Sequence, residues 1–97
     1  MEKKILEALK SVKHPAINLS LIDLGILQDI QIEDNKIKAT LAWPFDLVPP
    51  AIKQMIAASI ENAIKPFGMT FEYNEKLMNE DEKQRFLKLE HENWKGF

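Results

Sequence analysis

The side chains of this sequence that are able to carry covalent chemistry are few and lie far apart. Catalysis by a hydroxyl needs a serine, a histidine that accepts its proton and a carboxylate that orients the histidine. None of the three serines lies in a recognisable nucleophile turn, and Ser59 falls on an apolar helical stripe where a small residue serves close packing. The serines and histidines available are Ser11, Ser20, Ser59, His14 and His91. We therefore expect no serine nucleophile.

Metal and nucleotide binding also lack their usual residues. The chain has no cysteine, which excludes disulfides, thiolate-held metals or clusters, and cysteine nucleophiles. The dense acidic run Glu80-Asp81-Glu82 follows Asn79, an order typical of a helix N-cap with its capping box. The three glycines are isolated, so no glycine-rich loop is present to surround a phosphate. We expect no cofactor and no resident metal.

Two short motifs offer more specific chemistry. Asp23-Leu24-Gly25 precedes an expected strand, where Gly25 can take a positive φ and Asp23 can accept hydrogen bonds from backbone N–H groups. This motif is either a turn that orients the strand or a ligand contact. Trp43-Pro44-Phe45-Asp46 lies at an expected strand-to-helix corner, with both aromatic rings expected to be only partly covered. Partner contact and core filling both account for these rings, and Asp46 is also a candidate N-cap.

The spacing of apolar residues predicts the elements that must position these motifs. Helical spacing is found near the N-terminus, after the proline-rich corner and near the C-terminus, whereas alternation is found in three shorter segments. In the first alternating segment, Ile26, Ile30 and Ile32 share one face, Leu27 lies on the other, and only Gln28 interrupts the pattern. The first predicted helix is residues 1–12, the second begins at residue 49 or 50 and ends near residues 66–68, and the third runs from about 80 to about 93. The predicted strands are 26–33, 36–43 and 69–74.

This order of elements predicts an α+β fold with two layers. Strands with one apolar and one polar face favour a single three-stranded antiparallel sheet with helices on one side. The order is helix, strand, strand, helix, strand, followed by a C-terminal helix. We predict one domain over residues 1–74 and a helical extension of the same domain over 75–97. Phe86 and Trp94 of this extension either cover part of the second sheet face or contact a partner.

Composition limits the class of protein further. The 97 residues are 45% hydrophobic and 29% charged, which suits one self-folding domain. Thirteen basic and fifteen acidic side chains give a net charge of −2, so we expect no nucleic-acid partner. No apolar stretch approaches the roughly 18 residues of a membrane helix, and residue 1 opens directly into an amphipathic pattern. We expect a cytoplasmic protein without membrane contact.

Residues 14–27 resemble a known signature. Their order, with Pro15 near the start and Asp23-Leu24-Gly25 near the end, is similar to the Asp-Pro-Glu … Val-Asp-Leu-Gly-Leu-Val motif of the small iron-sulfur cluster assembly domain family. This family, long called domain of unknown function fifty-nine, includes PaaD-like and SufT-like proteins and the N-terminal domain of Mrp/ApbC-type cluster carriers. Its helix, hairpin, helix and third strand look like the order predicted above. The resemblance covers residues 5–73, and its Thr-Leu-Thr-x-Pro-Gly-Cys-Pro segment is matched, without gaps, by Thr40, Leu41 and Pro44.

The chain departs from this signature at four positions. His14 and Ala16 stand where the family has Asp and Glu, Phe45 replaces its Gly, and Asp46 stands where its Cys would be. A member without this cysteine has no thiolate with which to hold a cluster. A carboxylate beside a helix N-terminus is stabilised as an anion, so Asp46 suits a harder ion or a cationic partner.

The resemblance implies a role in iron-sulfur, or metal-sulfur, cluster assembly. We predict a non-catalytic accessory or adaptor protein that binds cluster-assembly or carrier proteins, among them a P-loop Mrp/ApbC-type ATPase, and a homodimer is left open. Two alternatives stay open: a metal-dependent enzyme subunit that uses His14, Asp23 and Asp46, and a structural dimerisation domain without its ancestral activity. The predicted partner-binding residues are Asp23, Leu24, Gly25, Trp43, Pro44, Phe45 and Asp46.

Overall fold

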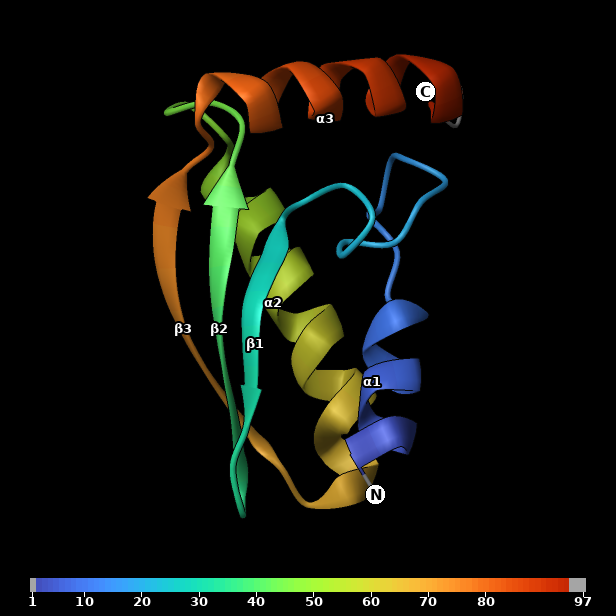
Figure 1. Cartoon of the computed structure of the whole chain (residues 1–97), viewed down its shortest axis with the longest axis vertical. Coiled ribbons are helices and arrows are strands. Elements are labelled where there is room, and N and C mark those ends of the chain that lie inside the picture. The colour runs from blue at the N-terminus through green and yellow to red at the C-terminus, as the bar shows by residue number, and fades with distance from the viewer. Residues whose placement is uncertain (1, 95–97) are drawn as a thin grey trace.

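The computed structural model of the chain describes residues 2–94 and confirms the predicted order of elements (Figure 1). Met1 and residues 95–97, parts of the first predicted helix and of the predicted C-terminal extension, lie outside the described residues. The fold is α+β, as predicted from the alternation of helical and strand patterns. Its elements are α1 (Glu2–Lys10), β1 (Leu27–Ile32), β2 (Lys36–Trp43), α2 (Pro50–Ile64), the 3-10 turn η1 (Lys65–Phe67), β3 (Thr70–Leu77) and α3 (Glu80–Asn93).

The helices are arranged on one face and at one end of a three-stranded sheet (Figure 1). Helices α1 and α2 cover one face, while α3 lies across the end at which β2 and β3 finish rather than over the second face. Among residues 2–94, no helix combines the length and apolarity needed to cross a membrane. Helix α3 therefore lies at the same end of the sheet as the segment between β2 and α2.

Strand β3 corrects the prediction of an all-antiparallel sheet. The strand order is β1-β2-β3, and β1 is antiparallel to β2, but β3 runs parallel to β2 in a continuous register from Lys36↔Thr70 to Trp43↔Leu77. The reason is α2, which is 15 residues long and so spans roughly 22 Å, close to the roughly 26 Å of an eight-residue strand. It returns the chain to the start of β2, and parallel strands require such a crossover.

A β-bulge in β1 corrects the predicted facing of its residues. Leu27 pairs with Leu41 and Ile32 with Ile37, so β1 has one more residue than β2 between these two pairs. The extra residue lies next to Asp29, whose φ of 52° is left-handed, a conformation that short polar side chains tolerate. Because the bulge shifts the alternation by one, Leu27 is buried in the core instead of lying on the polar face.

The core lies between the sheet and the helices α1 and α2. Its aliphatic side chains come from inward positions of the strands, from the apolar stripes of both helices and from the loop after α1. This loop, predicted as a packed connection, buries Ile17, Leu21 and Leu24. Most of the stabilising burial is thus aliphatic, and the largest fully buried side chains are Ile5, Leu9, Ile17, Leu21, Leu24, Ile26, Ile37, Leu41, Ile56, Ile60 and Ile64.

The start of α3 is held by the predicted capping box. The Asn79 side chain accepts a hydrogen bond from the Glu82 N–H at 2.8 Å, and the Glu82 carboxylate accepts one from the Asn79 N–H at 3.0 Å. The other Glu82 oxygen, Oε2, accepts a hydrogen bond from Gln28 Nε2 at 2.6 Å, and the Lys76 ammonium lies 3.6 Å from Oε1. The Asn79 N–H, then Gln28 and Lys76, hold the pKa of Glu82 below its ordinary value.

This lowered pKa predicts a pH dependence of stability. A carboxyl whose folded pKa is depressed stabilises the fold above its unfolded pKa, and this contribution is lost as the pH falls through the folded pKa. We expect Glu82→Gln to lower the free energy of unfolding by more at about pH 7 than at about pH 2, because wild type loses the contribution of the charge as the pH falls through the folded pKa. Urea unfolding at both pH values measures this. Glu61→Gln, at an exposed position of α2, is the control, and an equal cost of Glu82→Gln at both pH values would contradict the role of its charge.

Candidate functional site

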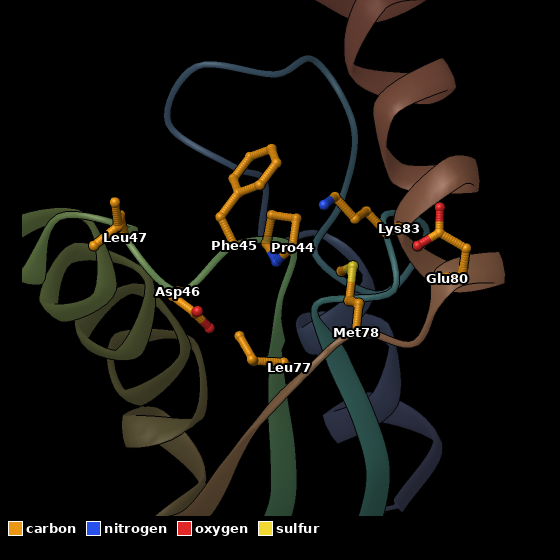
Figure 2. A pocket seen from close by; sticks show the side chains of 8 residues that line it. All are labelled: Pro44, Phe45, Asp46, Leu47, Leu77, Met78, Glu80 and Lys83. Atoms are coloured by element: carbon orange, nitrogen blue, oxygen red, sulfur yellow. The ribbon is translucent and has the colours of Figure 1, made fainter.

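The strand-to-helix corner between β2 and α2 forms one wall of an open groove (Figure 2). Strand β2 ends at Trp43 and α2 begins at Pro50. The other wall comes from the end of β3 and the first turn of α3, and the groove has a volume of about 580 Å³. In Figure 2 the Asp46 carboxylate points toward Leu77, and Lys83 extends toward the side of Phe45. The lining residues are Pro44, Phe45, Asp46, Leu47, Leu77, Met78, Glu80 and Lys83.

Phe45 is the aromatic side chain that this corner presents to solvent. Its side chain is 42% exposed, and the neighbouring Leu47 is also exposed. The Lys83 ammonium lies 5.3 Å from the centre of the Phe45 ring, a cation–π distance that favours a fixed ring position. The groove therefore offers an apolar anchor that α3 holds in place.

Trp43, predicted to be only partly covered, is in fact buried. It is 3% exposed, and its Nε1 donates a hydrogen bond to Glu75 Oε2 at 2.8 Å. Lys53 of α2 lies 3.5 Å from the same oxygen and 5.4 Å from the centre of the Trp43 ring. The side chain faces the helical layer because it continues the inward alternation of β2, and α2 passes beside it. Any contact that a partner makes with this corner therefore falls on its neighbours.

Asp46 is an exposed member of the groove and does not cap α2. The N-cap of α2 is Pro49, which has no side-chain capping hydrogen bond, so the reading of Asp46 as N-cap is wrong. The Asp46 carboxylate instead lies in the groove together with the Glu80 carboxylate and the Lys83 ammonium. Two carboxylates and one ammonium leave a local excess of negative charge beside the exposed Phe45 ring.

The Asp23-Leu24-Gly25 motif forms a turn at the same end of the sheet. Gly25 has the expected positive φ, 79°, and Leu24 is buried. The Asp23 side chain is exposed, and its backbone carbonyl accepts a hydrogen bond from Arg85 of α3 at 2.5 Å. Immediately after the turn, the Ile26 carbonyl accepts from the Ala42 N–H at 2.8 Å, which places the turn beside the end of β2. Helix α3 thus contacts both predicted motifs, through Lys83 and Arg85.

The alternative metal site of His14, Asp23 and Asp46 is not assembled. His14 lies in the loop after α1, where its Nδ1 accepts a hydrogen bond from the Ala16 N–H at 3.0 Å. The part of the chain that the structure describes contains no group of three or more His, Cys, Asp or Glu side chains able to hold a metal. A cluster carried as cargo finds neither thiolates nor a carboxylate–imidazole ligand set in these residues.

Comparison with known families identifies the family to which the sequence belongs. A family model described as iron-sulfur cluster assembly protein matches residues 2–69, which include both motifs and the whole β2–α2 corner. The chain belongs to this family. Membership indicates involvement in iron-sulfur cluster assembly, in agreement with the resemblance seen in the sequence. No curated protein matches the chain.

The family match ends before β3, so half of the groove in this cluster-assembly protein comes from residues outside it. Leu77, Met78, Glu80 and Lys83 were not predicted as site residues. They reach the corner because β3 is parallel to β2: Leu77 pairs with Trp43, and the Met78 N–H donates to the Trp43 carbonyl at 2.8 Å. The signal that was available in the sequence is the length of α2, which allows a crossover and hence this direction of β3.

Proposed function

We propose that this chain is a non-catalytic, cytoplasmic adaptor of iron-sulfur cluster assembly that binds a cluster carrier protein through the groove beside Phe45. The observation that supports the proposal most is the exposed Phe45 ring, which lies within the segment that the family model matches and is held by Lys83 of α3. Partly exposed aromatic side chains in a preformed hollow are the usual anchors of protein interfaces. Ligation by thiolate is excluded because the chain has no cysteine.

The chemistry of the groove describes the partner segment that fits it. Phe45, Leu47 and Leu77 offer apolar surface, and Asp46 and Glu80 stand at the polar rim. A complementary segment therefore carries an apolar side chain for the hollow and a basic residue beside it, in the core-and-rim arrangement common to interfaces. We assign this segment to a P-loop ATPase of the Mrp/ApbC type, the carrier class that the family resemblance suggests.

The binding test uses two variants of exposed groove residues. We expect Phe45→Ala to weaken binding of a purified Mrp/ApbC-type ATPase by at least about tenfold, since loss of a central aromatic anchor typically has this effect. We expect Asp46→Lys to weaken it as well, through repulsion of the basic residue on the partner. Isothermal titration calorimetry with the intact chain measures both dissociation constants.

Two matched control variants lie outside the groove. Met55→Ala removes an exposed apolar side chain of α2, and Asp34→Lys reverses an exposed charge between β1 and β2. Both controls should bind as wild type does, and circular dichroism should show all four variants folded. Binding by Phe45→Ala and Asp46→Lys at wild-type strength would refute the assignment of the groove.

A further inference from the structure

The two edges of the sheet differ in a way that points to a second binding surface. Strand β1 forms one edge and is interrupted by its bulge at Asp29. Strand β3 forms the other edge, and its pairing with β2 is regular over all eight residues. It contains no proline, and in Figure 1 no other element lies along its outer side. Edges that must stay unpaired are usually bulged, shortened, covered or charged. Strand β1 is bulged, whereas β3 is regular and uncovered, and its charged side chains are of both signs.

The hydrogen bonds of β3 to its neighbours show which of its backbone groups face outward. The Thr70 N–H donates to the Asn35 carbonyl at 3.0 Å, and the Met78 N–H donates to the Trp43 carbonyl at 2.8 Å. Since backbone groups of a strand alternate in direction with a period of two, the even-numbered residues between them also face β2. The odd-numbered residues Phe71, Tyr73 and Glu75 therefore direct their N–H and C=O groups outward.

We propose that β3 pairs antiparallel with β3 of a second copy of this chain, with the two Asn74 residues opposite each other. In this register Tyr73 forms a hydrogen-bonded pair with the second copy's Glu75. Glu72 then stands opposite the second copy's Lys76, and Lys76 opposite its Glu72. These are non-hydrogen-bonded pairs, in which facing side chains approach most closely. The contact is two-fold symmetric, and it joins two three-stranded sheets into one of six.

Charge selects this register among those that the backbone allows. Residues whose backbone groups face outward must pair with each other across the two copies. The two-fold axis of the pair therefore passes through a residue of β3 and not between two residues. A centre at Glu75 places two carboxylates directly opposite, which is destabilising. A centre at Tyr73 sets Glu72 opposite Asn74 and loses both ion pairs. The centre at Asn74 alone gives two opposite-charge pairs, which is why we assign a second copy to this edge rather than a foreign strand.

Exposed apolar side chains on the helical side of β3 support the same pairing. Tyr73 is 40% exposed and Leu77 is 53% exposed, although both lie on the face that the helices cover elsewhere. Phe71 stacks on Tyr73 with 5.1 Å between ring centres. In the proposed register Phe71 stands opposite the second copy's Leu77, and the reverse pair repeats this contact. The dimer therefore adds an apolar neighbour to the half-exposed Leu77 side chain.

Charge reversal with rescue tests the proposal. By sedimentation velocity across a dilution series, wild type should reach twice the chain mass of 11.2 kDa. Glu72→Lys and Lys76→Glu should each weaken the dimer by roughly tenfold, because like charges then face each other. The double variant should restore it. The ion pairs within one chain, Glu72 with Lys36 and Lys76 with Glu82, stay broken in the double variant, so rescue reports contact between copies.

Hydrogen exchange adds a readout with its own control. The outward amides of Tyr73 and Glu75 should be protected in the dimer and exchange quickly on dilution, while the inward amides of Glu72 and Asn74 should stay protected in both states. Phe45→Ala should dimerise normally, which separates this proposal from the adaptor function. A chain that stays monomeric at every concentration, or a dimer that neither reversal weakens, would overturn the proposal.

Discussion

Trp43→Ala should lower the free energy of unfolding by about 3–5 kcal/mol, the usual cost of deleting a large buried aromatic side chain. Trp43 is 3% exposed and belongs to the same buried cluster as Leu41 and Ile56. Its removal leaves a cavity between β2 and α2 and also removes the donor that serves Glu75. Urea unfolding measures this loss. The variant is for that reason unsuitable as a probe of binding, even though Trp43 adjoins the groove.

A second substitution separates packing from hydrogen bonding at this position. Trp43→Phe keeps most of the apolar contact but loses the 2.8 Å bond from Nε1 to Glu75, so we expect a cost of about 1–2 kcal/mol. Tyr73→Phe is the control, because it removes a polar group from a half-exposed aromatic residue on β3 and should cost less than about 0.5 kcal/mol. A loss below about 1 kcal/mol for Trp43→Ala would contradict the burial of the ring.

The burial of Trp43 was already encoded in its strand. Ile37, Ala39, Leu41 and Trp43 alternate without interruption, and all four are buried. The expectation of a partly covered ring came from its position at the strand-to-helix corner, which predicts exposure only for the residues after the strand ends. Phe45, outside the alternation, is the aromatic side chain that is exposed. Local pattern therefore distinguishes the two rings once the end of the strand is known.

The direction and facing of strands were harder to predict than their existence. Alternation identifies a strand but has the same period in either direction, so the parallel pairing of β3 rests on the length of α2 rather than on β3 itself. In β1 the signal lay in the spacing of three between Leu27 and Ile30, which a regular strand does not allow if both residues face the core. Gln28, which interrupted the alternation, precedes the bulge and binds Glu82 of α3.

The residues of the candidate site also differ in whether the local sequence predicts them. The corner residues from Pro44 to Asp46 were predictable because a turn-rich segment must follow a strand and precede a helix. Leu77 and Lys83 were not, since their place in the groove depends on the direction of β3 and on the docking of α3. Contacts between segments that are distant in sequence leave no local period. The capping box of Asn79 and Glu82, by contrast, is local and was predicted correctly.

Phe86→Ala tests whether α3 unfolds together with the sheet, and we expect it to cost about 3–5 kcal/mol. Phe86 is 3% exposed and belongs to the same core cluster as Ile26 and Trp43. Backbone contacts also join α3 to the body: the Asn18 N–H donates to the Asn93 carbonyl at 2.9 Å. A helix attached in this way adds to the stability of the core rather than only to its own. Urea unfolding of the full chain measures this cost. The control is Lys88→Ala, at an exposed position of α3, which should change the free energy of unfolding by less than about 0.5 kcal/mol.

Hydrogen exchange identifies the cooperative unit that this substitution affects. If α3 and the sheet unfold as one, Phe86→Ala should reduce the protection of the Ile37 and Leu41 amides in β2 by the same factor as that of amides in the middle of α3, because both then exchange through global unfolding. Loss of protection confined to α3, with β2 unchanged, would show that the helix opens independently. In that case the wall of the groove that carries Lys83 would be mobile relative to Phe45, and the cation–π contact between them would not hold the anchor in place.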